Sequence, residues 1–157
     1  MRIPNHNTDV VLFPHQVRRS LICIVLVALQ LLPLDLPAEV LVVTGAGSQL
    51  STLSRNQVSD VFLGKVVSLP DGSSSILIDQ PDSSPLREEF YMKVANKTAA
   101  QAKAHWAKLY FTGRAVPPYQ GKDEAEVKKM VSSTPGAIGY IERSALDSSV
   151  KILFVAP

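Results

Sequence analysis

The sequence predicts an α/β fold in which helices pack on the faces of a mixed sheet. After residue 38, short apolar runs typical of buried strands alternate with segments whose apolar residues recur at helical spacing. Ser, Thr or Asp stands where each predicted helix begins, and Gly or Pro follows several of them. Because alternating strands and helices favour parallel strand pairs covered by helices, we expect at least part of the sheet to be parallel.

Length and charge limit the chain to one ordinary domain. Its 157 residues are 46% hydrophobic and 19% charged, enough for a single core. The formal net charge is only +2, and the charges of residues 39–157 nearly balance. This composition gives no basic surface for nucleic acid, so we expect no nucleic-acid partner.

Residues 1–38 have the pattern of an export signal. Arg18 and Arg19 precede an apolar run at 21–32 (LICIVLVALQLL), and 36–38 (LPA) ends on a small residue. A retained membrane anchor is the alternative, but this run is shorter than the ~20 residues that span a bilayer. We expect cleavage near Ala38 and membrane contact through this segment alone. The single cysteine, Cys23, lies inside it, so residues 39–157 can form no disulfide.

The first predicted elements of the remaining domain are a strand and a helix. The apolar run 39–44 (EVLVVT) predicts a buried strand that ends at 45–48 (GAGS). Ser54 with Gln57 forms a capping-box pattern, and Gly64 is expected to end the helix in the left-handed conformation. The inward face of this helix is predicted from helical spacing at Val58, Val61 and Phe62.

Two short strands and a second helix are expected next. Strands are predicted at 66–67 and 75–79, separated by a turn at 70–72 (PDG). Ser84 followed by Pro85 is typical of a helix start. The buried stripe of that helix is predicted at Leu86, Phe90 and Val94.

The last third predicts two more helices and two strands. Thr98 with Gln101 opens a helix that ends at Gly113, and 117–121 (PPYQG) is predicted as a loop. Asp123 with Glu126 opens the next helix. Strands at 137–141 and 150–155 close the domain, with Gly139 allowing another part of the chain to approach closely. The apolar residues of the 98–113 helix are Ala102, Trp106, Leu109 and Tyr110.

The segment 79–90 (DQPDSSPLREEF) has the clearest chemistry. A strand that ends at Asp79 and a helix that starts after Ser84 direct free backbone N–H groups and the positive end of the helix dipole toward one point. The hydroxyls of Ser83 and Ser84 and the guanidinium of Arg87 are expected to add hydrogen bonds to an anion. The alternative is structural: Ser84 only caps the helix, and Arg87 pairs with Asp82 or lies in solvent.

Three motifs in order, at 61–65 (VFLGK), 79–90 and 135–142 (PGAIGYIE), resemble the second lobe of periplasmic phosphate-binding proteins. These are the substrate-binding proteins of ABC-type phosphate transporters. The resemblance covers nearly all of residues 57–155. It implies that 39–157 form a single lobe of the type II periplasmic-binding-protein fold, that the protein works in the periplasm, and that its ligand is phosphate or a related oxyanion.

The resemblance also assigns candidate site residues. Ser84 matches the Ser of the family motif and Arg87 a common following Arg, while Gln80 stands where the first Arg is expected. With Ser83 these are the candidate anion ligands. Pro85 and Leu86 replace a Gly and a Thr, which removes a backbone donor and a hydroxyl. The alternative implied by these replacements is a ligand-free periplasmic module that kept the fold and docks to another envelope protein.

A glycine-containing segment at 45–48 and a single histidine are the remaining candidate features of the sequence. The segment 45–48 is similar to a Gly-Ala-Gly-Ser stretch that contacts phosphate in the first lobe of the family. We interpret it as a loop; under the alternative interpretation it is a second candidate contact for the ligand. After residue 38 there is one histidine, His105, and no cysteine. Without a nucleophile–base pair or a metal-ligand cluster, we expect no enzyme activity, no metal and no cofactor.

Overall fold

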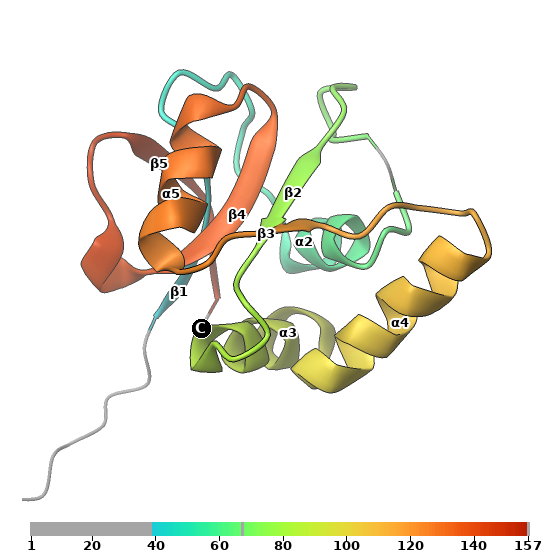
Figure 1. Ribbon diagram of the computed structural model, residues 1–157. Helices are drawn as coiled ribbons and strands as arrows, with labels where there is room; N and C mark the ends of the chain where they lie inside the picture. Colours follow the sequence, from blue (N-terminus) through green and yellow to red (C-terminus); the bar gives the residue numbers. More distant parts are fainter. Residues whose placement is uncertain (1–38, 67, 157) are drawn as a thin grey trace, which may run out of the picture. The chain divides into compact units, whose positions relative to one another are not determined.

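The computed structural model describes residues 39–66 and 68–156, and the predicted export signal with its cleavage near Ala38 lies outside the described residues. The described chain forms a five-stranded sheet in the order β3-β2-β4-β1-β5 (Figure 1). Strand β2 is parallel to β3 and β4, whereas β1 is antiparallel to β4 and β5. The mixed sheet is therefore confirmed. The strands are β1 (Val40–Gly45), β2 (Ile76–Asp79), β3 (Tyr119–Gln120), β4 (Ala137–Glu142) and β5 (Val150–Ala156).

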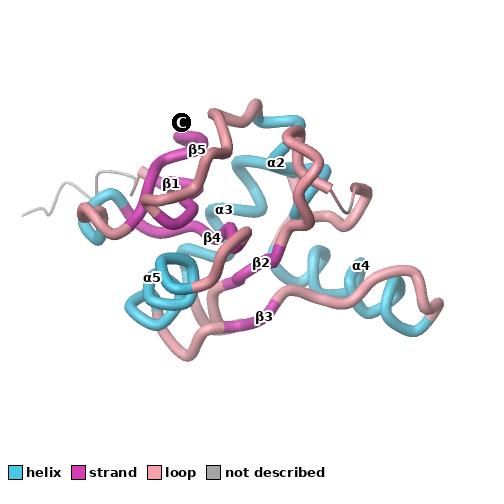
Figure 2. Tube along the Cα trace, turned by 90° about the horizontal axis from the view of Figure 1, so that it is seen from above, coloured by secondary structure: helices cyan, strands magenta, loops and turns pink. Residues whose placement is uncertain are grey.

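Helices cover both faces of this sheet, as Figures 1 and 2 show. Alternate residues of β1 point to opposite faces, because side chains alternate along a strand. Val40 and Val42 pack in a cluster with α2 and α3, and Leu41 and Val43 pack in a second cluster with α5. The helices are α2 (Arg55–Phe62), α3 (Pro85–Ala95), α4 (Ala99–Phe111) and α5 (Glu124–Ser133), and a 3-10 turn, η2 (Arg143–Ala145), links β4 to β5.

Local capping chemistry sets where two helices begin, as predicted. At the start of α2, Gln57 N–H donates to Ser54 Oγ over 3.3 Å, and Ser54 N–H donates to Gln57 Oε1 over 2.8 Å. The same reciprocal pair joins Thr98 and Gln101 at the start of α4. These bonds satisfy backbone donors that the helix itself leaves free, so each helix begins at its predicted residue.

Close packing explains two of the predicted glycines. Gly64 has φ of +62°, and a Cβ there would lie 2.7 Å from Cη2 of Trp106. At Gly139 a Cβ would lie 2.8 Å from Cγ2 of Val131 and 3.2 Å from the carbonyl oxygen of Ile78. The left-handed helix end and the close approach within β4 are thus both confirmed.

Two sequence-based expectations were wrong in detail. Val66 is not part of a strand, and the turn that follows is closed by a 2.8 Å hydrogen bond from Leu69 N–H to the carbonyl of Ser73 and by an isolated bridge between Ser68 and Ser74; Val67 is not described. The predicted loop 117–121 contains β3, which pairs with the end of β2. This two-residue strand depends on a partner about 40 residues away along the chain, so its own residues give no strand pattern.

Candidate anion site

The site lies where β2 ends and α3 begins. Asp79 is the last residue of β2, and residues 81–84 form a turn closed by a 2.9 Å hydrogen bond from Ser84 N–H to the carbonyl of Pro81. Pro85 then occupies the first turn of α3, where its missing N–H costs no hydrogen bond. The turn brings Asp82 back toward the first turn of α3, on which Arg87 lies.

Asp79 is the buried acceptor at the centre of the site. Its carboxylate accepts hydrogen bonds from Arg87 Nε at 3.0 Å, from the Tyr91 hydroxyl at 3.0 Å and from Gln80 N–H at 2.9 Å, as well as from the Tyr140 hydroxyl. Burial, followed by the Asp79 charge, raises the pKa of both tyrosines well above the usual value. Both phenols therefore remain protonated donors to the carboxylate.

Arg87 joins this buried acceptor to the surface. Its side chain is only 5% exposed; Nη1 donates to Asp82 over 2.8 Å, and the guanidinium carbon lies 5.5 Å from the centre of the Tyr91 ring. Burial acts to lower the pKa of Arg87, but the charge and hydrogen bond of Asp79 outweigh it, so the net shift is upward. The guanidinium is permanently charged and is shared between two carboxylates.

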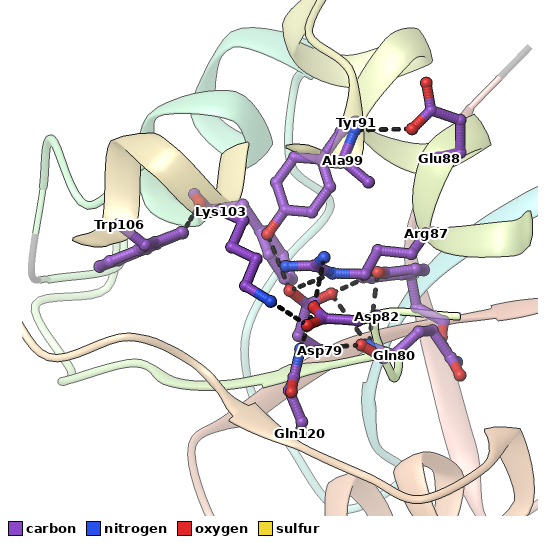
Figure 3. A network of polar contacts seen from close by, with 12 residues as sticks. Asp79, Gln80, Asp82, Arg87, Glu88, Tyr91, Ala99, Lys103, Trp106 and Gln120 are labelled. Carbon is purple, nitrogen blue, oxygen red and sulfur yellow. Dashed lines mark hydrogen bonds and ion pairs between the residues drawn. The ribbon is translucent and has the colours of Figure 1, made fainter. Parts of the chain in front are cut away.

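Asp82 is the exposed counterpart of Asp79, with a side chain that is 45% exposed. Three donors from three elements meet on its carboxylate: Arg87 Nη1 from α3, Lys103 Nζ from α4, and Gln120 Nε2 from β3 at 3.1 Å (Figure 3). The hydrogen bond from Lys103, followed by that from Gln120, lowers the pKa of Asp82. The arrangement is a small cluster of cationic and amide donors around one carboxylate.

Lys103 and Gln120 were missed by the sequence analysis. Lys103 lies in the middle of α4 and Gln120 in the unpredicted strand β3, so neither belongs to the motif at 79–90. No local pattern marks them, because only the packing of α4 and the pairing of β3 with β2 bring them to Asp82. Figure 3 shows both side chains directed toward this carboxylate.

The four predicted ligands are close in sequence but differ in environment. Arg87 is held by Asp79 and Asp82, so the structural alternative of an Arg87–Asp82 pair describes its contacts. Gln80 is buried and its side-chain amide donates to the carbonyl of Tyr140 over 2.9 Å. Ser83 is exposed, and Ser84 takes the N-cap position without a side-chain capping bond. Ser83 and Ser84 therefore lie at the junction of β2 and α3, whereas the Gln80 side chain is buried against β4.

The backbone donors at this helix start are partly used. Ser84 N–H bonds to Pro81, Arg87 N–H bonds to the carbonyl of Ser84 over 3.1 Å, and Pro85 has no N–H. An anion at this junction would therefore depend on side-chain donors more than on the backbone.

The second candidate contact, 45–48, lies at the other end of the sheet. It follows β1, which runs antiparallel to β4, whereas the candidate site follows β2, which runs parallel to β4. The loop borders a pocket of ≈ 410 Å³ whose lining includes Thr44, Asp71 and Ser133, and no Lys, Arg or His is among the described residues that line it. The structure therefore does not bring this loop to Arg87.

The remaining candidate features have structural contacts. Nε2 of His105 lies 2.8 Å from the carbonyl oxygen of Leu63, which ties α4 to the end of α2. Among residues 39–66 and 68–156, no three His, Cys, Asp or Glu side chains gather to hold a metal ion. None of the helices in this same part of the chain has the length and apolar character needed to cross a membrane.

Comparison with solved structures defines the fold as a single lobe of the type II periplasmic-binding-protein fold. A phosphate ABC transporter substrate-binding protein from Clostridium perfringens, described with bound phosphate, has a TM-score of 0.61 at 21% identity over 74% of this chain and 44% of its own. An ABC-type phosphate transport receptor from Vibrio cholerae gives 0.59 at 15% identity, over 74% and 45%. PstS from Borrelia burgdorferi gives 0.56 at 16% identity, over 74% and 46%.

The likeness extends over most of this chain but over less than half the length of each of these structures. It confirms the predicted resemblance at the level of fold, and these structural neighbours are described as transport proteins and not as enzymes. The sequence matches no protein-family model and no curated protein.

Proposed function

We propose that this chain is a periplasmic substrate-binding-protein-like domain that binds phosphate or a related oxyanion for an ABC-type uptake system. The observation that carries the proposal is the donor cluster of Arg87, Lys103 and Gln120, at the end of β2 in a fold shared with proteins described as phosphate receptors. Export through the signal at 1–38 would deliver the domain to the periplasm.

Each candidate residue has a part in this proposal. The Arg87 guanidinium offers a planar fork suited to two oxyanion oxygens, and Lys103 adds a mobile point charge. Ser83 and Ser84 lie at the same junction and add hydroxyl donors. Gln80, whose amide is fixed to Tyr140, holds the start of the turn in place. Binding in this form needs neither catalysis nor a cofactor.

Calorimetric titration with phosphate and then sulfate at low ionic strength tests the proposal. Lys103→Ala is the better probe, because Lys103 is exposed, whereas Arg87 is buried and its removal disturbs the fold. We expect saturable heat that weakens several-fold in Lys103→Ala and is unchanged in Lys108→Ala, an exposed lysine on the same helix. A folded protein that gives no saturable heat with either anion contradicts the proposal.

A second candidate function is the ligand-free docking module. It is favoured by the pairing of Arg87 with two carboxylates and by an apolar surface at the β3 edge of the sheet. There, Val66, Val116 and Tyr119 are exposed beside a pocket of ≈ 300 Å³ that Trp106 also lines. Absence of anion binding, together with loss of an envelope-protein interaction in Tyr119→Ser, is the result that distinguishes this function from the first.

A further inference from the structure

The contacts of Asp82 resemble those of a bound ligand. One carboxylate oxygen accepts from both Arg87 Nη1 and Gln120 Nε2, at 2.8 and 3.1 Å, and the other accepts from Lys103. The donors come from three separate elements, and their only shared acceptor among these contacts is this half-exposed side chain (Figure 3). A phosphate or sulfate ion can offer two oxygens to the same three donors.

We propose that Asp82 is an internal competitor, whose carboxylate fills the place that an external oxyanion takes. The inference rests on the proposed function and adds how access to the site is controlled. The anion enters when Asp82 leaves the donors, and the site closes on itself when the anion leaves. The ligand class is a small free oxyanion with at least two available oxygens.

Burial of Arg87 supports this exchange. The Arg87 side chain is 5% exposed, and its Nη1 pairs with Asp82 whereas its Nε pairs with Asp79. An anion that takes the place of Asp82 on Nη1 needs Asp82 to move. Asp82 is free to do so because it belongs to a surface turn, whereas Asp79 is fixed by its buried contacts. The exchange is therefore a local movement of the turn at 81–84 and leaves the core in place.

Charge leads to the same conclusion. Asp79, Asp82, Arg87 and Lys103 together carry no net charge, so the closed site has little attraction for an anion. Moving Asp82 away leaves one net positive charge at the donors. Because the apparent dissociation constant equals the intrinsic one divided by the open fraction, a site that is closed 90–99% of the time would bind roughly 10- to 100-fold more weakly than an open one.

The test is titration of inorganic phosphate and sulfate into the protein and into Asp82→Asn and Asp82→Ala. The matched control is Asp147→Asn, which removes another half-exposed carboxylate that is paired with a lysine, Lys128, away from the site. Circular dichroism establishes that each variant is folded. We expect affinity to increase about 10-fold or more in both Asp82 variants, to stay unchanged in the control, and to fall back when Lys103→Ala is added to Asp82→Ala.

The outcomes separate this inference from the proposed function. If the unaltered protein binds phosphate and the Asp82 variants bind it equally or more weakly, the internal competitor is overturned while oxyanion binding stands. If no folded variant binds either anion, Asp82→Ala included, both are overturned. Binding that appears only after Asp82 is replaced supports the internal competitor and overturns oxyanion binding by the unaltered protein.

Discussion

Replacing Arg87 with Ala would leave the Asp79 carboxylate buried among two phenol hydroxyls and a backbone N–H, without the ion pair that Arg87 gives it. Asp79 is 1% exposed and its contact with Arg87 Nε is 3.0 Å, so the carboxylate would lose its buried charged partner. Removing one member of a buried ion pair costs about 3–5 kcal/mol, because the remaining charge is left uncompensated. We therefore expect Arg87→Ala to be among the most destabilising single changes in this domain.

Urea denaturation followed by circular dichroism measures this effect. With a denaturant slope of about 1–3 kcal/mol per M, the midpoint should fall by roughly 2 M. Lys103→Ala is the matched control, because its ion pair with Asp82 is exposed and such pairs contribute about 0–1 kcal/mol. A loss below about 1 kcal/mol in Arg87→Ala would refute the reasoning.

A double-variant cycle separates the charge from the packing of the arginine. In an Asp79→Asn background there is no buried carboxylate that Arg87→Ala could leave unpaired. Arg87→Ala should therefore lower the free energy of unfolding by less than it does in the unaltered protein. Equal costs in the two backgrounds would mean that the alkyl chain of Arg87, and not its charge, carries the effect.

Three further predictions concern the core, a helix end and pH. Phe90→Ala should cost about 3–5 kcal/mol in urea denaturation, because its ring is buried and stacks on Tyr140 with centroids 3.8 Å apart; a loss under 1 kcal/mol would contradict this packing. Gly64→Ala should lower the melting temperature, since φ is +62° and the new Cβ would lie 2.7 Å from Trp106. An unchanged melting temperature would contradict the expected backbone strain and steric clash. The pKa of Asp82 is lowered in the folded state, so the ionised carboxylate stabilises the fold at pH values above its unfolded pKa near 3.9. This stabilisation is lost as the pH falls through the folded pKa, so the urea midpoints of the unaltered protein and Asp82→Asn should converge below about pH 4. A constant difference between the two midpoints from about pH 7 to about pH 3 would contradict this prediction.

The parts of the fold that depend on neighbouring residues were predictable from the sequence. The capping boxes Ser54–Gln57 and Thr98–Gln101 act over three residues, so their pattern places the starts of α2 and α4 directly. Gly64 is likewise a local signal for a helix end. These features need no knowledge of the rest of the chain.

The parts that depend on distant residues were not predictable. β3 exists because Tyr119 and Gln120 pair with the end of β2, and its own sequence reads as a loop. The same pairing brings Gln120 to Asp82, and helix packing brings Lys103 there. The sequence thus indicates Arg87 as a candidate ligand but not the donors that join it, nor the buried Asp79 that holds it.

The opposite positions of the two predicted anion contacts offer the most direct test of where an anion binds. Two-dimensional proton–nitrogen NMR spectra recorded during phosphate addition, for the unaltered protein and for Asp82→Asn, report both places at once. We predict that the resonances of Arg87 Nε–H and the Gln120 side-chain amide shift together, at lower phosphate concentration in Asp82→Asn, while the amide resonances of residues 44–48 do not shift. Shifts centred on residues 44–48, or none at saturating phosphate in either protein, would contradict it.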